Sequence, residues 1–293
     1  MKLKSIQLLL FSVLLVFAGV AWAAATYSCN ISTLPNNYSQ TYSGLSNSST
    51  SLSLSITCIK TGNGGALTIN YTVTPSNGLW ASGAQNRAAL SGNFINYDIY
   101  TDATCTTAWS GTGSMAMPGG GPATITQALT YFGCVPMAQP GLPPPATYGD
   151  TVTMTLATTT AGVTITGTNP APFTVSVIVP AVCTISTLPG TVAFTYTAFS
   201  AVAVAANTTF QSTCSNLLPY TMSLDATTDV VGGLNYSLAL NTSGTGGVHP
   251  LASTGTGAAQ TFYINGTMPA GQAGTCATAS CLTSQVRTLT ITY

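Results

Sequence analysis

The chain contains two copies of one pattern, and this duplication limits the folds open to its 293 residues more than any other feature. The heptapeptide CNISTLP at 29–35 recurs as CTISTLP at 183–189, and the next cysteine follows after 29 residues in the first copy and 31 in the second. The repeat therefore predicts two homologous domains, each long enough for its own core. Further matches in the same order are Asn96-Tyr97 with Asn235-Tyr236, Gly133-x-x-Pro136-x-x-Gln139 with Gly266-x-x-Pro269-x-x-Gln272, and 151–156 with 288–293.

Apolar residues alternate with Ser and Thr in several short segments of the chain. Such alternation turns one face of a strand toward a core and the other toward solvent, and clusters of Gly, Pro, Asn and Ser separate the segments as turns. The clearest examples are 52–56, 67–73, 152–156 and 173–179. The sequence thus predicts an all-β fold of two tandem immunoglobulin-like β-sandwich domains.

Charged residues make up only 3% of the chain, and all five acids are Asp. Nucleic-acid binding needs a basic surface that neutralises phosphates, so this composition excludes it. The single histidine, His249, lies in a turn-like stretch, and no G-x-S-x-G motif is present. The closest acid pairs in sequence, Asp98 with Asp102 and Asp225 with Asp229, are typical of surface or turn positions. We therefore expect no enzymatic activity, no metal site and no cofactor.

The first 23 residues have the pattern of a secretory signal peptide. Lys2 and Lys4 precede an almost wholly apolar run at 6–20, and Ala21-Trp22-Ala23 matches an A-x-A cleavage site. The alternative, a membrane anchor, is disfavoured because the apolar run is short for a bilayer span. The mature protein is therefore expected to be exported.

The eight cysteines support export, because an even count in an exported chain indicates disulfides. Zinc is disfavoured, since no CxxC motif and no second histidine are present. The repeat suggests one bridge between the first two strands of each copy and one private bridge in each domain. These pairs are Cys29–Cys58, Cys183–Cys214, Cys105–Cys134 and Cys276–Cys281.

The order C-x-I-S, a second cysteine about thirty residues on, G-x-x-P-x-x-Q and a closing alternating strand resembles the spore coat protein U domain family. That family supplies subunits of archaic (Csu-type) chaperone–usher pili. The resemblance covers 29–156 and 183–293. The family usually carries G-x-Y-x-D before its last strand, and the first copy has ATYGD at 146–150. The second copy has SQVR at 284–287 and an extra cysteine pair, so its match is poorer.

The resemblance implies sandwiches that lack their last strand and receive it from the N-terminal segment of a neighbouring subunit by β-strand addition. It implies a periplasmic pilus chaperone, an outer-membrane usher and an adjacent pilin subunit as partners, and an abiotic or host surface as the target. We expect secretion through the periplasm to the cell surface. A position at the pilus tip is expected because 24–28 is too short to serve as a donor strand.

The expected organisation is a signal peptide at 1–23, an N-terminal adhesin-like domain at 24–160, a linker at 161–180 and a C-terminal pilin domain at 181–293. The second domain ends at Tyr293 without a closing strand, so it is expected to accept one from another subunit. The linker carries an alternating segment that could complete the first domain as an internal donor strand. The alternative is that this segment is the first strand of the second domain; its apolar residues are Phe173, Val175, Val177 and Val179.

Three loops of the first domain are unusually apolar for a secreted protein. Family members at pilus tips carry hydrophobic finger loops, so we expect these loops to attach to surfaces. The alternative is that their side chains fold back onto the core. Two other functions stay open, a structural pilus or coat subunit without its own receptor and, less favoured, a carbohydrate-binding adhesin. The candidate contact residues are Leu79, Trp80, Trp109, Met115, Met117, Val135, Met137 and Leu142.

Overall fold

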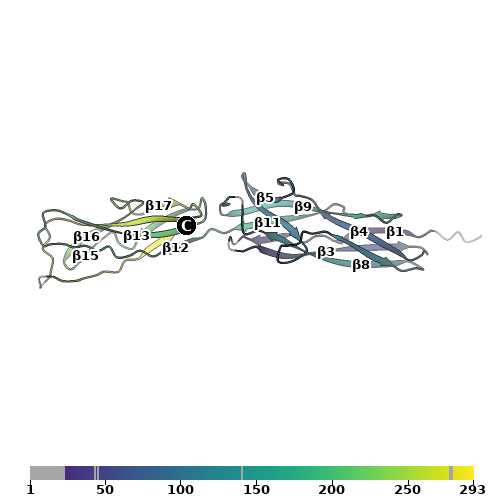
Figure 1. Ribbon diagram of the computed structural model, residues 1–293, viewed down its shortest axis with the longest axis horizontal. Helices are drawn as coiled ribbons and strands as arrows, with labels where there is room; N and C mark the ends of the chain where they lie inside the picture. The colour runs from purple at the N-terminus through teal and green to yellow at the C-terminus, as the bar shows by residue number, and fades with distance from the viewer. Residues whose placement is uncertain (1–23, 43, 45, 140, 277–279) are drawn as a thin grey trace, which may run out of the picture.

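The computed structural model describes residues 24–42, 44, 46–139, 141–276 and 280–293. These residues form strands and no helix, and they build two β-sheet domains placed end to end (Figure 1). The expected signal peptide, 1–23, lies outside the described residues. Within the described part of the chain, no helix could span a membrane. The predicted all-β fold with two domains is confirmed.

The first domain is a sandwich of two layers. One layer has the order β10-β1-β3-β8-β6, and the other contains β5, β9, β11 and β2, with β4 pairing to β9 and to β7. The first layer comprises β1 (Thr26–Thr33), β3 (Ser48–Thr61), β6 (Asn93–Tyr100), β8 (Ala123–Val135) and β10 (Val163–Ile165). The second comprises β2 (Tyr38–Thr41), β4 (Leu67–Pro75), β5 (Asn86–Leu90), β7 (Thr112–Met117), β9 (Ala146–Thr158) and β11 (Ala171–Val179).

The core of the first domain lies between these layers. Inward side chains come from every second residue of the strands, as the alternation predicts; Leu54, Val73 and Val152 are fully buried. Burying one such side chain stabilises a fold by about 1.5–3 kcal/mol. Strand β6 connects the layers, because 93–97 pair with β5 and 98–100 pair with β8.

The second domain is a smaller sandwich with a separate core. Its first layer has the order β12-β13-β18-β16-β15, and its second has the order β17-β14-β19. The first layer comprises β12 (Cys183–Thr187), β13 (Val204–Cys214), β15 (Thr228–Val231), β16 (Leu234–Asn241) and β18 (Ala259–Met268). The second comprises β14 (Pro219–Leu224), β17 (Leu251–Thr254) and β19 (Leu289–Thr292).

The sequence repeat is also a structural repeat. β12, β13 and β18 pair as β1, β3 and β8 do, and β19 occupies the place of β9 beside β14. Among the described residues of the second domain, no strand corresponds to β2, β10 or β11. The segment 161–180, expected as a linker, contributes β10 and β11 to the first sandwich. The two domains are joined by the short stretch 180–182.

All eight cysteines are paired, and the pairs are those predicted from the repeat. Cys29 lies directly opposite Cys58 in the β1–β3 ladder, and Cys183 lies opposite Cys214 in β12–β13. Each of these bridges therefore joins the first strand of a domain to the strand beside it. A bridge that closes about thirty residues stabilises a fold by roughly 3.5 kcal/mol through loop-closure entropy.

Candidate functional site

Strand β11 fills the gap between β9 and β2 in the first domain. It runs antiparallel to β9, with Phe173 opposite Val152, and parallel to β2, with Val175 opposite Tyr38. Its inward side chains, from Phe173 to Val179, all lie in the first core. β11 therefore closes this sandwich from within the same chain.

The corresponding position in the second domain is open. β19 pairs with β14, and no strand of the described chain pairs with its other edge. The segment 190–198 lies where β2 lies in the first domain, because Gly133 faces Tyr38 and its counterpart Gly266 faces Val192 and Phe194. This segment packs against the second core but is not part of a sheet. We call the gap between β19 and 190–198 the open edge.

Exposure of equivalent residues measures what the open edge lacks. Leu156 at the end of β9 is 2% exposed, whereas its counterpart Tyr293 is 57% exposed. Val152 is fully buried, whereas its counterpart Leu289 is only partly buried. A shallow hollow of about 460 Å³ lies across β17, β14 and β19 near Tyr293, on the side of β19 away from 190–198. Unpaired backbone beside apolar surface is a template for another strand.

The repeated G-x-x-P-x-x-Q motif has a structural role in both domains. Gln139 Oε1 accepts a hydrogen bond from the Asn96 backbone N (2.6 Å), and Gln139 Nε2 donates to the oxygens of Asn96 and Pro136. Gln272 makes the same three bonds with Asn235 and Pro269. The glutamine therefore fastens the loop after β8 or β18 to the neighbouring strand β6 or β16.

The departure from the G-x-Y-x-D pattern in the second copy has a physical explanation. In the first domain the buried Asp150 accepts hydrogen bonds from the hydroxyl of Tyr97 (2.7 Å) and from the Leu79 backbone N (2.8 Å). Arg287 stands at the equivalent place in the second domain and donates to the hydroxyl of Tyr236. The guanidinium of Arg287 also pairs with Asp229, and this hydrogen bond lowers the pKa of the Asp229 carboxyl. The carboxylate of the first domain is thus replaced by Arg287, whose charge is balanced by the carboxylate of Asp229.

Three of the candidate contact residues are not on loops, so that part of the expectation is wrong. Met115 and Met117 are buried because they are inward positions of β7, and Val135 is buried as the last residue of β8. Trp109 is half-buried: its Nε1 donates to the oxygen of Val73 (2.9 Å), and its ring packs on Tyr131. Trp109 therefore folds back onto the domain, as the alternative interpretation had it.

The remaining candidates are exposed, but they do not share one end of the domain. Leu79 is 70% exposed and Trp80 is 47% exposed, on a loop fastened to Asp150 and Arg87. Met137 and Leu142 belong to the loop 136–145, which faces the second domain, because Asn216 Nδ2 donates to the oxygen of Leu142 (2.6 Å). Of the three loops expected to attach to surfaces, the one that carries Met137 and Leu142 therefore faces the second domain instead.

A different set of loops gathers at the end of the first domain that points away from the second (Figure 1). These loops, 62–66, 118–122 and 159–162, connect strand ends that the pairing brings together, and we call this end the distal pole. Gly64 and Gly120 exchange two backbone hydrogen bonds (2.9 and 2.8 Å), and Thr160 Oγ1 accepts one from the Asn70 N. The three loops contain Gly, Pro, Ala, Thr and Asn and no charged residue.

One buried lysine lies beneath the distal pole. Lys60, at the end of β3, is fully buried, and its Nζ donates to the backbone oxygens of Pro118 and Gly120. It therefore holds loop 118–122 in place. This arrangement was not among the expected contact sites, although glycine clusters at 62–65 and 119–121 mark it in the sequence.

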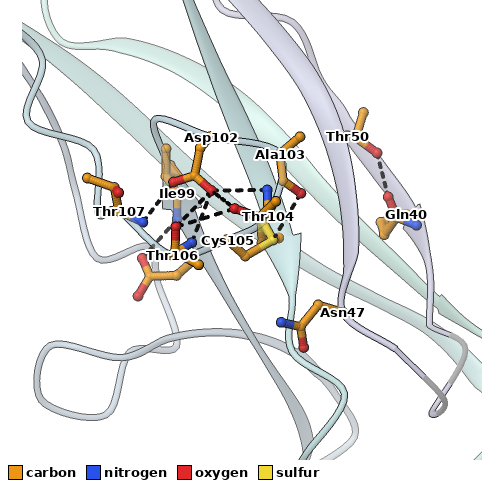
Figure 2. Close-up of a disulfide and its surroundings, with 12 residues drawn as sticks. Gln40, Asn47, Thr50, Ile99, Asp102, Ala103, Thr104, Cys105, Thr106 and Thr107 are labelled. Atoms are coloured by element: carbon orange, nitrogen blue, oxygen red, sulfur yellow. Dashed lines mark hydrogen bonds between the residues drawn. A yellow bond between two sulfur atoms is a disulfide. The ribbon is translucent and has the colours of Figure 1, made fainter.

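Other polar residues considered from sequence also have structural roles. The carboxylate of Asp102 accepts hydrogen bonds from Thr104, Thr106 and Thr107 and so shapes the loop that carries Cys105 (Figure 2). These bonds, chiefly that from the Thr104 hydroxyl, hold the pKa of Asp102 well below its usual range. His249 Nε2 accepts a hydrogen bond from the Leu224 backbone N (2.8 Å). Within the described ranges, no three potential metal ligands lie together.

Comparison with known proteins identifies a family whose sequence pattern this chain shares. The model of the Spore Coat Protein U domain matches residues 15–155 and 169–246. No curated protein sequence matches the chain. Among solved structures, the chain is similar to the CsuC–CsuE chaperone–tip adhesion subunit pre-assembly complex of Acinetobacter baumannii, with 14% identity, a TM-score of 0.45 and coverage of 90% of this chain and 100% of that one. It is also similar to the CupB6 tip adhesin of Pseudomonas aeruginosa, with 9% identity, a TM-score of 0.39 and coverage of 91% and 94%.

The family match covers the first copy of the repeat almost entirely and the second copy as far as residue 246, including the paired cysteines at 29 and 58 and at 183 and 214. It covers most of the chain, and it agrees with the two sandwiches that share one strand order. The chain therefore belongs to the Spore Coat Protein U domain family.

Proposed function

We propose that the chain is the tip adhesin of a chaperone–usher pilus. The observation that carries this proposal is the difference between the two domains at one position. The first domain holds its own β11, whereas the second presents an open edge at the same place. The first domain then needs nothing from a neighbour, and the second docks to the fibre by accepting a strand.

Strand donation from the first domain to a neighbour is disfavoured by the pairing of its strands. β1 already lies between β3 and β10, and β11 leads directly into the second domain. The open edge is therefore the place for a periplasmic chaperone before assembly and for an adjacent pilin afterwards. An outer-membrane usher would bring the two subunits together.

The position along the fibre can be tested directly. Antibodies against the first domain, used in immunogold electron microscopy of piliated cells, are expected to label fibre ends. The physical reason is that a subunit that accepts a strand at one open edge, and whose described strands β1 and β11 are already paired, would occupy one end of a fibre. Regular labelling along the fibre would contradict the tip position and favour the alternative of a structural subunit.

We place the surface contact at the distal pole. This end lies farthest from the docking domain and carries small uncharged residues, so pressing it against an apolar surface desolvates little polar side-chain area. Burial of apolar surface contributes about 25 cal/mol per Å². The bonds of Lys60, Gly64 and Gly120 hold the loops in one arrangement and so reduce the entropy cost of contact.

Charges introduced at the distal pole should abolish attachment. Gly65→Asp with Ala161→Asp is expected to reduce the number of cells attached to a hydrophobic surface at least about tenfold, because partial desolvation of a carboxylate costs more than about 1.4 kcal/mol. Both positions tolerate the change, since Ala161 is exposed and a side chain at Gly65 meets no atom within 4 Å. The assay counts attached piliated cells.

The control for this experiment is the neutral pair Gly65→Asn with Ala161→Asn, which should leave attachment intact. Trp80→Ser tests the exposed flank separately. Loss of attachment in Trp80→Ser alone would move the contact to the flank. Full attachment in every variant would overturn the adhesin assignment and leave the structural subunit.

A further inference from the structure

The junction between the two domains contains more than the connecting strand. The loop 136–145, between β8 and β9, contacts the second domain through Leu142. Its backbone oxygen accepts the bond from Asn216, and its Cδ1 lies 2.5 Å from the position that a Cβ at Gly257 would occupy. Ser215 Oγ in turn donates to the oxygen of Pro180 in the connecting stretch (3.1 Å). Two features therefore hold the domains together. One is β11, which is part of the first sandwich and continues into the second domain, and the other is the contact of the Leu142 loop with the second domain.

The equivalent loop of the second domain lies at its free end. It connects β18 to β19 and spans 269–288, about twice the length of 136–145. Met268 pairs with Val204, at the opposite end of β13 from Cys214, which lies beside the first domain. This loop thus points away from the first domain, as the Leu142 loop points toward the second (Figure 1).

The described part of this loop is held by hydrogen bonds and carries two exposed apolar side chains. Gln285 Nε2 donates to Asp229 (2.7 Å), and Gln285 Oε1 accepts from the hydroxyl of Tyr236 (2.8 Å). The Cys276–Cys281 bridge closes the loop just before Leu282. Leu282 is fully exposed and Val286 is 89% exposed, more than any other large apolar residue in the described ranges. These two side chains therefore leave apolar surface uncovered in the free subunit.

We propose that Leu282 forms a second contact with the next subunit of the fibre, equivalent to the contact of Leu142 with the second domain. Val286 aligns with Gly149, so it would lie beside the incoming strand itself. This inference rests on the proposed function, because it requires a neighbour at the open edge. The neighbour would therefore be held in two ways, by its donated strand and by contact of its folded domain with the Leu282 loop of this chain.

The position of β11 identifies the partner that fits. A strand in the register of β11 would enter beside Tyr293, run antiparallel to β19 and leave at the end that carries Leu282. In this chain Val179 is followed by three residues and then by Cys183, the first residue of β12. The partner is thus a related subunit with alternating apolar residues that end about four positions before its first cysteine. The folded domain of that partner, which begins at its first cysteine, would lie next to Leu282.

The chain itself supplies a surrogate for that partner. Residues 157–293, appended after Tyr293 of the full chain, continue the sequence as it follows Leu156 and repeat the natural junction. In this concatemer, Leu282 of the original second domain would face Gly257 and Asn216 of the added one. The comparison is the full chain with a synthetic peptide of residues 171–182, which supplies the strand without a body.

Hydrogen exchange and thermal unfolding test the two contacts separately. A strand in the register of β11 pairs with residues equivalent to 146–154, which are 283–291 in the second domain. The peptide should therefore protect 283–291 alone, whereas the concatemer should also protect 280–282. Leu282→Asp should lower the melting temperature of that domain in the concatemer by at least about 4 °C. It should not change the melting temperature of the peptide-bound full chain. Val248→Asp, a change at an exposed apolar residue bonded to Leu240 away from this end, should have no effect in either.

The outcomes separate the inference from the function on which it rests. If neither the peptide nor the concatemer protects β19, strand acceptance itself is wrong. If β19 is protected but Leu282→Asp leaves the concatemer unchanged, strand acceptance stands and the second contact is overturned. A decrease confined to the concatemer, with the peptide-bound chain unaffected, supports the contact.

Discussion

Appending residues 157–179 after Tyr293 should raise the melting temperature of the second domain by more than about 10 °C. The appended copy continues the alignment of Tyr293 with Leu156, so its β11 sequence can fold back antiparallel to β19. Four apolar side chains would enter the second core, each contributing about 1.5–3 kcal/mol before the cost of ordering the strand. A net gain of only 2 kcal/mol moves the melting temperature of a domain this small by roughly 8–16 °C.

The matched control changes only the face of the appended strand. Replacing the copies of Phe173, Val175 and Val177 with Ser should remove the gain, whereas replacing the outward Thr174 and Ser176 with Ala should keep it. The transitions of the two domains are followed by scanning calorimetry. Equal melting temperatures for the extended and native chains would show that the open edge does not accept a strand.

Val177→Asp and Phe173→Ala should unfold the first domain selectively. Both residues lie in the first core, and Phe173 packs against Tyr131. Phe→Ala in a core costs about 3–5 kcal/mol, which lowers the melting temperature of a domain of about 150 residues by roughly 6–20 °C. Val177→Asp should be more severe, because it buries a carboxylate without a partner.

The unfolding transition of the second domain is the control for this experiment. Its core is separate, so its own transition should not move in either variant. Thr174→Asp, an exposed substitution on the same strand, should leave both transitions in place. If Phe173→Ala destabilised the second domain instead, β11 would belong to that domain, as the alternative interpretation of the sequence holds.

Local patterns predicted the fold well because, in a strand with one buried face, every second residue is apolar. The alternation at 52–56 and 152–156 and the offset of the cysteine pairs needed no knowledge of distant contacts. The candidate loops failed for the opposite reason. Met115 and Met117 are separated by a single residue among Gly and Pro, and only pairing with β4 decides that they face inward. Which loops share a pole likewise depends on strand direction, which the sequence does not state locally.

The open edge of the second domain could be predicted only in part from the sequence. The repeat aligns Tyr293 with Leu156, but only the structure shows that Tyr293 is exposed whereas Leu156 is buried. The arginine at 287 was visible as a departure from pattern, but its pairing with Asp229 was not, because 58 residues separate the two.

The direction of β11 has a mechanical consequence. The strands of the first domain run along the length of the molecule, and β11 leads straight into the second domain (Figure 1). In the proposed adhesin, with the distal pole anchored and the fibre pulled, tension would enter the first sandwich along this strand. Its hydrogen bonds to β9 on one side and β2 on the other lie across the pulling direction. They are consequently loaded in shear and must fail together, whereas bonds that open one at a time from a strand end would yield at much lower force.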